Sequence, residues 1–387
     1  MRPRQAWRRP RALARHSTRR SWRVGLLGLL VALLALSGGP AAALARGHFR
    51  PTGRLHEARF QETATLLPSG KVLVTGGFRF GFLATAEVYD PQRGRWSVAA
   101  PFYSPRDAHT ATLLRNGSVL IAGGGNLTAD FLSSTERYLP ESNVWVPAAP
   151  LSVPRNNHTA TLLQDGRVLV AGGLNRFGPA LASSEAYNPE SDRWTRVRSL
   201  HTARYHHTAT LLPGGRVLVV GGEQGSAGNL RQLSSAELYD PRRNRWISAG
   251  HLPYSLSNQT ATLLKDGRVL VAGGGDREPG FTPRAEIYNP RRNRWTRAAS
   301  LPAPRAFGVA VRLRDGRVLV VGGINDRGGV SAGELYNPRR NRWSFAGTLT
   351  PATLRQAAVL LRNGRALIIG GQRDNGPPVA KTTLYVP

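Results

Sequence analysis

A repeat of about fifty residues restricts the possible folds of this chain more than any other feature. Pairs of adjacent glycines begin at positions 76, 123, 172, 221, 273, 322 and 370, at spacings of 47, 49, 49, 52, 49 and 48 residues. Six tryptophans keep the same spacing, and a Glu-x-Tyr triplet precedes each of them. Such a period is typical of solenoids and propellers, in which each repeat buries its apolar face against its neighbours.

The local sequence within one repeat predicts four antiparallel strands. In the third copy we expect them at residues 158–163, 167–171, 184–187 and 193–197. Asp165-Gly166 separates the first two strands as a two-residue turn, because Asx-Gly pairs tolerate the positive φ angles of tight hairpins. Turn signals recur at short intervals and no segment has helical periodicity, so a helical solenoid is excluded.

The glycine pair, the spaced tyrosine and tryptophan and the period near fifty together resemble kelch repeats. The resemblance covers residues 48–387 and implies an all-β fold, a seven-bladed kelch β-propeller with one four-stranded antiparallel blade per repeat. The seventh copy has no tryptophan strand, whereas Phe49 stands at the matching distance before Thr63. We therefore expect the N-terminal strand to complete the last blade in a 3+1 arrangement, which leaves no open sheet edge.

Residues 1–45 are predicted to be a signal peptide that precedes the propeller domain, residues 46–387. They hold nine arginines and no acidic residue, an apolar run over residues 24–36, a Ser-Gly-Gly-Pro break and small residues at positions 43–45. This is the layout of a secretory signal, and the Arg19-Arg20 pair leaves a twin-arginine route open as well. The alternative is an uncleaved membrane anchor. The predicted location is therefore secreted or in the cell envelope, outside the cytoplasm.

The composition bears on chemistry mainly through what is missing. The chain has 53 Lys and Arg against 23 Asp and Glu, a net charge of +30, and no cysteine. The lack of cysteine excludes disulfides, Cys-ligated zinc and a thiol nucleophile. In the galactose-oxidase-like propellers that these repeats resemble, copper-radical chemistry needs a tyrosine cross-linked to a cysteine and a copper ligand from a domain after the propeller. We therefore expect no oxidase of that kind and no cofactor, and no nucleophile motif such as G-x-S-x-G or H-E-x-x-H is present.

Repeated arginines just before the first strand, and histidines at its start, are candidates for a ligand site in the central funnel. These funnel candidates are Arg59, Arg106, Arg155, Arg204, Arg305, His109, His158 and His207. The kelch resemblance implies that an arginine at this position can face the central opening and help to ring an acidic ligand. The alternative, which we favour, is a structural ion pair with the glutamate of the third strand. Equivalent histidines of different blades diverge around the axis, so we expect no metal site.

The two faces of such a propeller differ in chemistry. One face carries the short turns within the hairpins, and three of those turns read Pro-Arg-Arg-Asn-Arg-Trp. They contribute nine arginines: Arg242, Arg243, Arg245, Arg291, Arg292, Arg294, Arg339, Arg340 and Arg342. This patch would attract a polyanion, and the alternative is a solvated turn copied by repeat duplication. The other face carries long loops that vary between blades, with Phe80, Phe131, Phe177, Arg277 and Arg327 as candidate contact residues.

These observations favour a secreted or cell-surface binding module that recognises a glycan, an anionic envelope polymer or a protein through its propeller loops. The alternative is an extracytoplasmic carbohydrate-active enzyme with a site in the central funnel, and a purely structural envelope component comes third. Secretion argues against nucleic acid as a partner. Membrane contact is expected only through the export signal or an uncleaved anchor, and we expect a monomer.

Overall fold

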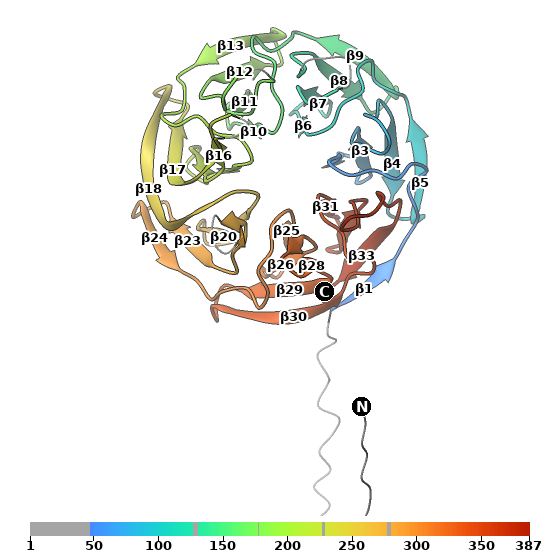
Figure 1. Ribbon diagram of the computed structural model, residues 1–387. Helices are drawn as coiled ribbons and strands as arrows, with labels where there is room; N and C mark the ends of the chain where they lie inside the picture. The colour runs from blue at the N-terminus through green and yellow to red at the C-terminus, as the bar shows by residue number, and fades with distance from the viewer. Residues whose placement is uncertain (1–46, 127–130, 177, 227–228, 277–279) are drawn as a thin grey trace, which may run out of the picture. The chain divides into compact units, whose positions relative to one another are not determined.

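The computed structural model describes residues 47–387 except 127–130, 177, 227–228 and 277–279. The predicted signal peptide, residues 1–45, lies outside the described residues. Seven antiparallel sheets surround a central axis (Figure 1), which confirms the predicted all-β, seven-bladed propeller. In this part of the chain no helix is long and apolar enough to cross a membrane.

Each of the first three predicted repeats forms one blade, with its strands in order from the axis outward. Blade 1 contains β2 (Thr63–Leu66), β3 (Val72–Thr75), β4 (Ala86–Asp90) and β5 (Arg95–Ala99). Blade 2 contains β6 (Thr110–Leu113), β7 (Val119–Ala122), β8 (Thr135–Leu139) and β9 (Val144–Ala148). Blade 3 contains β10 (Thr159–Leu162), β11 (Val168–Ala171), β12 (Ser184–Asn188) and β13 (Arg193–Val197), each within one residue of its predicted ends.

The remaining blades repeat this order, with short extra ladders in three loops. Blade 4 contains β14 (Thr208–Leu211), β15 (Val217–Val220), β17 (Arg231–Asp240) and β18 (Arg245–Leu256), and β16 (Glu223–Gln224) pairs with β17. Blade 5 contains β19 (Thr260–Leu263), β20 (Val269–Ala272), β23 (Ala285–Asn289) and β24 (Arg294–Arg297), and its loop pairs β21 (Gly275–Asp276) with β22 (Gly280–Phe281). Blade 6 contains β25 (Val309–Arg312), β26 (Val318–Val321), β29 (Ala332–Asn337) and β30 (Arg342–Thr348), and its loop pairs β27 (Ile324–Asn325) with β28 (Gly328–Gly329). Blade 7 contains β31 (Ala357–Leu360), β32 (Ala366–Ile369), β33 (Thr382–Val386) and β1 (His48–Pro51).

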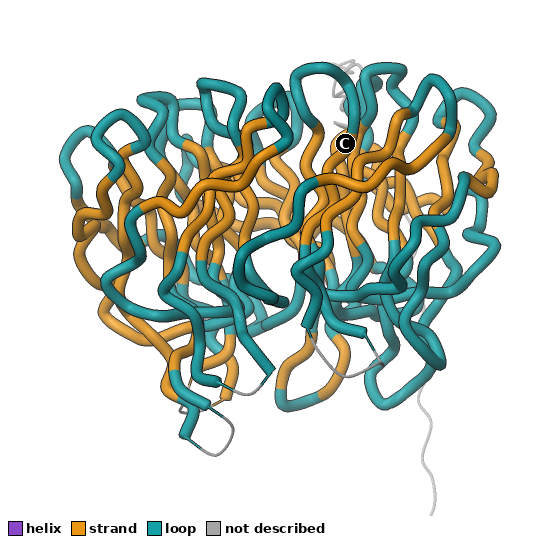
Figure 2. Tube along the Cα trace, turned by 90° about the horizontal axis from the view of Figure 1, so that it is seen from above, coloured by secondary structure: helices purple, strands orange, loops and turns teal. Residues whose placement is uncertain are grey.

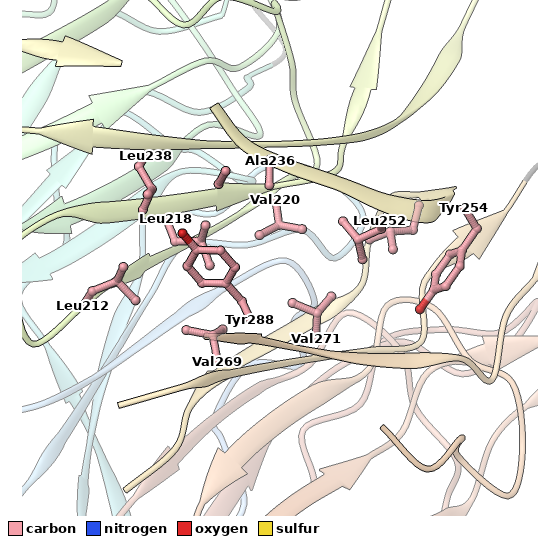
Figure 3. Close-up of a cluster of buried hydrophobic side chains, with 12 residues drawn as sticks. Leu212, Leu218, Val220, Ala236, Leu238, Leu252, Tyr254, Val269, Val271 and Tyr288 are labelled. Atoms are coloured by element: carbon pink, nitrogen blue, oxygen red, sulfur yellow. The ribbon is translucent and has the colours of Figure 1, made fainter. Parts of the chain in front are cut away.

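The hydrophobic core lies between neighbouring blades. The second strand of each blade is an apolar run such as Val72-Leu73-Val74, and it is fully buried because both of its faces are covered. Figure 3 shows the seam between blades 4 and 5, where Leu218 and Leu238 pack in one cluster with Val269 and Tyr288. A single repeat has no such core, so the stability of the ring depends on packing between repeats.

The repeated tyrosine and tryptophan join the outer strands of a blade to each other and to the preceding blade. In blade 2, Tyr138 and Trp145 are cross-strand partners whose ring centroids lie 5.0 Å apart. The Trp145 Nε1 donates a hydrogen bond of 2.8 Å to the Ala100 carbonyl, which follows the last strand of blade 1. Blades 1, 3, 4, 5 and 6 contain the same aromatic pair at 5.0–5.1 Å. Such pairs contribute about 0.5–1.5 kcal/mol each beyond the area that they bury.

The paired glycines allow two blades to approach closely near the axis. The Gly124 amide donates a hydrogen bond of 2.9 Å to the Arg155 carbonyl of the next blade. Gly123, at φ +62°, lies so close to the same carbonyl that a Cβ atom would be 2.5 Å from its oxygen. A side chain at this position is therefore excluded.

The N-terminal strand closes the ring, as the sequence predicted. β1 pairs with β33 as the outermost strand of blade 7, with Phe49 opposite Tyr385. The two rings lie 5.1 Å apart. Phe49 also covers Gly333 and Gly347 of blade 6, where a Cβ atom on Gly333 would lie 2.7 Å from its ring. Strands from the two ends of the propeller domain thus share one sheet, and β1 pairs with the edge of β33 that would otherwise be open.

Loops gather at the two opposite ends of the strands (Figure 2). The hairpin turns between the first and second strands, and between the third and fourth, lie at one end, which we call the short-turn face. The loops between the second and third strands, and the connections between blades, lie at the other end, the long-loop face. The two faces therefore display separate sets of side chains.

Candidate functional site

The funnel arginines are buried inside their blades. In blade 2, Arg106 has no exposed surface, and its Nη2 donates a hydrogen bond of 2.8 Å to the Glu136 carboxylate on the third strand. Its Nη1 donates to the carbonyls of Gly123 and Ser134, both at 2.9 Å. The same ion pair recurs as Arg59–Glu87 at 3.0 Å, Arg155–Glu185 at 2.9 Å and Arg204–Glu237 at 2.8 Å. These guanidinium groups therefore link the strands of a blade and are not accessible to a ligand in the opening.

Blade 6 keeps this ion pair in a looser form. Arg305 is 2% exposed and its Nη2 lies 3.9 Å from the Glu334 carboxylate. Burial lowers the pKa of Arg305 to about 10, as it does for Arg106, and in each case the neighbouring glutamate opposes the shift. Both arginines remain charged at neutral pH. The geometry is that of the ion-pair alternative named from the sequence.

The three funnel histidines each contact the blade that precedes their own. The Nε2 atoms of His109, His158 and His207 lie 2.9, 3.1 and 2.9 Å from the hydroxyls of Thr75, Thr110 and Thr159 respectively. Burial lowers the pKa of His109 to about 3 and shifts the other two in the same direction, so the imidazoles are neutral. They lie at three successive blade seams. Among the described residues no group of three or more His, Asp or Glu side chains could hold a metal ion.

A ring of backbone hydrogen bonds surrounds the axis at the long-loop face. Each blade contributes one residue, which stands two positions before the innermost strand of that blade. Its backbone N–H donates a hydrogen bond of 2.9–3.3 Å to the carbonyl of the equivalent residue in the preceding blade. We call these residues the axial ring: Gln61, Ala108, Asn157, His206, Asn258, Phe307 and Arg355. Each has a left-handed backbone, with φ between +46° and +58°. The ring is closed, since Gln61 donates to Arg355.

The axial ring combines a uniform backbone with side chains that differ between blades. All seven side chains are partly exposed. On one side the Arg355 guanidinium lies 4.7 Å from the centre of the Phe307 ring. Burial raises the pKa of the nearby Asp107 carboxyl to about 6, and the positive charge of Arg355 opposes the shift.

The opposite side of the axial ring is polar. The His206 ring lies 4.6 Å from the Tyr205 ring, and its Nδ1 is 3.6 Å from the Glu223 carboxylate. Burial acts to raise the pKa of Glu223, but His206, Ser257 and Tyr205 together lower it to about 2. Glu223 is therefore an anion across the ordinary pH range.

The sequence predictions did not include the axial ring, although the sequence contains a signal for it. In each of the first four repeats, two variable residues separate the repeated arginine from the polar residue that precedes the repeated Thr-Ala-Thr strand. These variable positions include the axial ring. Their left-handed backbone could not be predicted, because Ala108, Gln61, Phe307 and Arg355 are residue types that rarely adopt it.

The three long-loop candidates that the structure describes, Phe80, Phe131 and Arg327, lie in the loops of blades 1, 2 and 6. Phe80 is 82% exposed, and the Arg79 guanidinium lies 5.1 Å from its ring centre. Phe131 is half-buried and Arg327 is exposed. Phe177 and Arg277 lie outside the described residues. Next to Phe80, the rings of Phe60, Phe78 and Phe82 form a chain of edge contacts at 5.6 and 5.2 Å.

The nine short-turn arginines are all exposed and lie on three consecutive blades, 4, 5 and 6. One ion pair is found for them in the described part of the chain, Arg243 with Asp240 at 4.0 Å. The patch therefore carries a net positive charge at the surface.

Comparisons with known proteins agree on the fold. Residues 157–371 match the family model described as the KLHDC2/KLHL20/DRC7 Kelch-repeats domain, and residues 64–102 match the Kelch motif model. No curated protein matches the chain. Among solved structures, the chain is similar to a novel fungal alcohol oxidase of the AA5 family in complex with copper, with a TM-score of 0.71 and 19% identity. That similarity covers 88% of this chain and 76% of the oxidase, and at this identity it shows a common fold alone.

Proposed function

The chain belongs to the kelch-repeat family, and on that premise we propose that it binds a protein partner at the axial ring on the long-loop face. Kelch propellers generally act as protein-interaction modules. The axial ring is the observation that carries this proposal. It is the place where a backbone geometry common to all seven blades presents side chains that differ between them.

The backbone of the ring supports a binding role. A non-glycine residue in the left-handed region costs of order 1 kcal/mol or more, and such strain is retained where the surrounding structure holds it in place. Here a closed set of backbone hydrogen bonds holds it. The side chains of the ring are thus displayed from a rigid support, which lowers the entropy cost of binding.

The chemistry of the axial ring and its neighbouring side chains suits an extended segment of a protein. The amides of Asn157 and Asn258 can exchange hydrogen bonds with a peptide main chain, since each offers a donor and an acceptor. Phe307 and Phe78, which are both partly exposed, offer apolar contact, and the charges of Arg355 and Glu223 lie on different sides of the ring. An elongated ligand with an amide backbone and mixed side chains matches this arrangement.

A carbohydrate-active enzyme is not the function that we propose. Its predicted site rested on the funnel arginines, and those side chains are buried in ion pairs. A location outside the cytoplasm remains part of the proposal, on the basis of residues 1–45. Fusing these residues to a reporter enzyme that is active only after export tests it, and an inactive reporter would refute it.

The binding site can be tested with substitutions that favour the left-handed backbone. Peptides selected from a random displayed library on the full chain should bind at least ~10-fold more weakly to Phe307→Asn and Arg355→Asn, about 1.4 kcal/mol or more. Both variants should fold, because asparagine adopts the left-handed region more readily than phenylalanine or arginine. Phe345→Asn, at a residue 66% exposed on β30, is the matched control.

Two outcomes would refute the proposed site. Selected peptides that bind the ring variants and the parent chain equally would place the binding elsewhere. Binding of glycans but not of any peptide, lost in the same two variants, would keep the axial ring as the site and overturn the assignment of a protein partner.

A further inference from the structure

The nine short-turn arginines extend from three turns with the same fixed backbone. In each turn an Asp or Asn oxygen accepts the amides of the first two arginines at 3.0–3.3 Å: Asp240, Asn289 and Asn337 respectively. The asparagine before the third arginine has φ of +45° or +46°, and its Oδ1 accepts the hydroxyl of the tyrosine of its own blade at 2.7–3.0 Å. The backbones of these turns are therefore held at both ends, and their arginine side chains extend into solvent.

Grooves run between these turns and the inner hairpin turns of neighbouring blades. The groove between blades 3 and 4 has a volume of about 610 Å³ and is lined by Arg216, Arg242 and Arg243, among other residues. The next groove, between blades 4 and 5, has a volume of about 510 Å³ and contains Arg216 again, with Arg268 and Arg291. Because Arg216 borders both grooves, the two form one continuous basic surface.

A third groove continues this surface. It lies between blades 5 and 6, has a volume of about 500 Å³, and is lined by Arg268, Arg317 and Arg339 among other residues. Carboxylates partly neutralise the inner row of arginines: Asp240 lies 3.4 Å from Arg216, Asp266 2.7 Å from Arg268, and Asp315 2.5 Å from Arg317. The excess positive charge therefore resides on the outer turns.

We propose that the short-turn face of blades 4 to 6 binds a linear polyanion without nucleobases, whose repeated phosphate or sulfate groups lie in these three successive grooves. The inference does not rest on the proposed function, because it concerns the opposite face of the propeller. Three equivalent turns on consecutive blades match a ligand that repeats its charge along its length.

The geometry of the grooves favours tetrahedral anions over carboxylates. Each groove presents arginines from two different turns, as with Arg216 and Arg242. The oxygens of a phosphate or sulfate group are arranged tetrahedrally, so the group can accept hydrogen bonds from turns on two sides, whereas the two oxygens of a carboxylate lie in one plane. No aromatic side chain lines the three grooves, so they offer no platform for stacking nucleic-acid bases.

A polymer should bind far more tightly than its monomer. Occupying a second and a third groove is an intramolecular step once one group is bound, and linkage of this kind raises affinity by about 10²–10⁴-fold. Release of counterions makes the affinity fall with salt, with a slope of about −4 to −5 in a log–log plot if six arginines are neutralised.

The test compares inorganic polyphosphate, sulfated dextran and single-stranded DNA with tripolyphosphate and polyglutamate, using the full chain and fluorescence anisotropy. We expect long polyphosphate or sulfated dextran to bind at least ~100-fold more tightly than tripolyphosphate, and the preferred polymer identifies the source of the oxyanion. A triple variant should bind the preferred polymer at least ~10-fold more weakly; it combines Arg242→Gln, Arg291→Gln and Arg339→Gln. It keeps the backbone bonds of the turns, and blade 1 has Gln92 at the same position.

The control variant removes the same charge from other blades. Arg93→Gln, Arg95→Gln, Arg193→Gln changes three exposed arginines outside the three grooves and should alter the affinity by less than ~2-fold. Equal losses in both variants would show attraction by net charge alone and would overturn the proposal. Affinity that does not depend on polymer length, polyglutamate bound as tightly as polyphosphate, or DNA preferred to both oxyanion polymers would also overturn it.

Discussion

Replacing Phe49 by alanine tests whether the N-terminal strand holds the ring closed. The Phe49 ring packs on Tyr385 and covers the two glycines of blade 6, and the backbone pairing of β1 with β33 is unaffected by the substitution. A buried phenylalanine contributes about 3–5 kcal/mol relative to alanine. Phe49 keeps part of its surface exposed, so the lower end, about 3 kcal/mol, applies. With about 2.1 cal/mol/K of unfolding entropy per residue over roughly 340 residues, the melting temperature should fall by about 4 °C.

Thermal unfolding followed by circular dichroism, together with urea titration, measures this change. Phe345→Ala is the matched control, because the same residue type is 66% exposed on β30 of the adjacent blade. It should change stability by no more than about 0.5 kcal/mol. An unchanged melting temperature in Phe49→Ala, or an equal fall in the control, would refute the closure argument.

Three further predictions concern buried ionisable groups. Burial raises the pKa of Glu62 from 4.5 to about 8, so the folded protein holds a proton that the unfolded chain releases, and stability falls as pH rises through this range. Blade 7 has Gln356 at the position equivalent to Glu62. In Glu62→Gln the melting temperature should therefore change less between about pH 5 and 8 than it does in the parent, and an equal change in both proteins would contradict this. Burial lowers the pKa of His109 from 6.5 to about 3, so below pH 6.5 the unfolded chain binds a proton that the folded protein does not, and stability falls. The melting temperature of His109→Gln should therefore fall less on acidification than that of the parent. Arg106→Leu leaves the Glu136 carboxylate buried without its partner and should cost about 3–5 kcal/mol in urea unfolding, whereas Arg106→Leu with Glu136→Leu should recover most of it. A single variant as stable as the parent would show that the pair is not needed.

The fold could be predicted from the sequence because its signals act over short distances. Asp165-Gly166 specifies a tight turn, and Val168 to Ala171 form an apolar run that becomes the buried second strand. The closing strand was predictable for the same reason, since Phe49 stands at a fixed number of residues before the first repeat. The same turn residues and apolar runs then recur in each of the seven repeats.

The candidate sites depend on side-chain directions and on contacts between distant residues, which the sequence does not show. Whether Arg106 faced the opening or Glu136 was left open by the sequence, because the direction of a side chain depends on the packing of strands around it. The backbone bond from Gln61 to Arg355 joins residues at opposite ends of the domain. The axial ring was therefore not among the predicted sites, because the sequence does not show that its seven residues meet around one axis.

Two levels of information thus separate in this protein. Its blades, their number and their closure follow from turn chemistry, apolar runs and a constant period, each of which acts on neighbouring residues. The burial of the funnel arginines, the closed axial ring and the three joined grooves of the arginine turns arise only when seven blades meet around an axis. They depend on distances between residues of different repeats, and a linear pattern does not specify those distances.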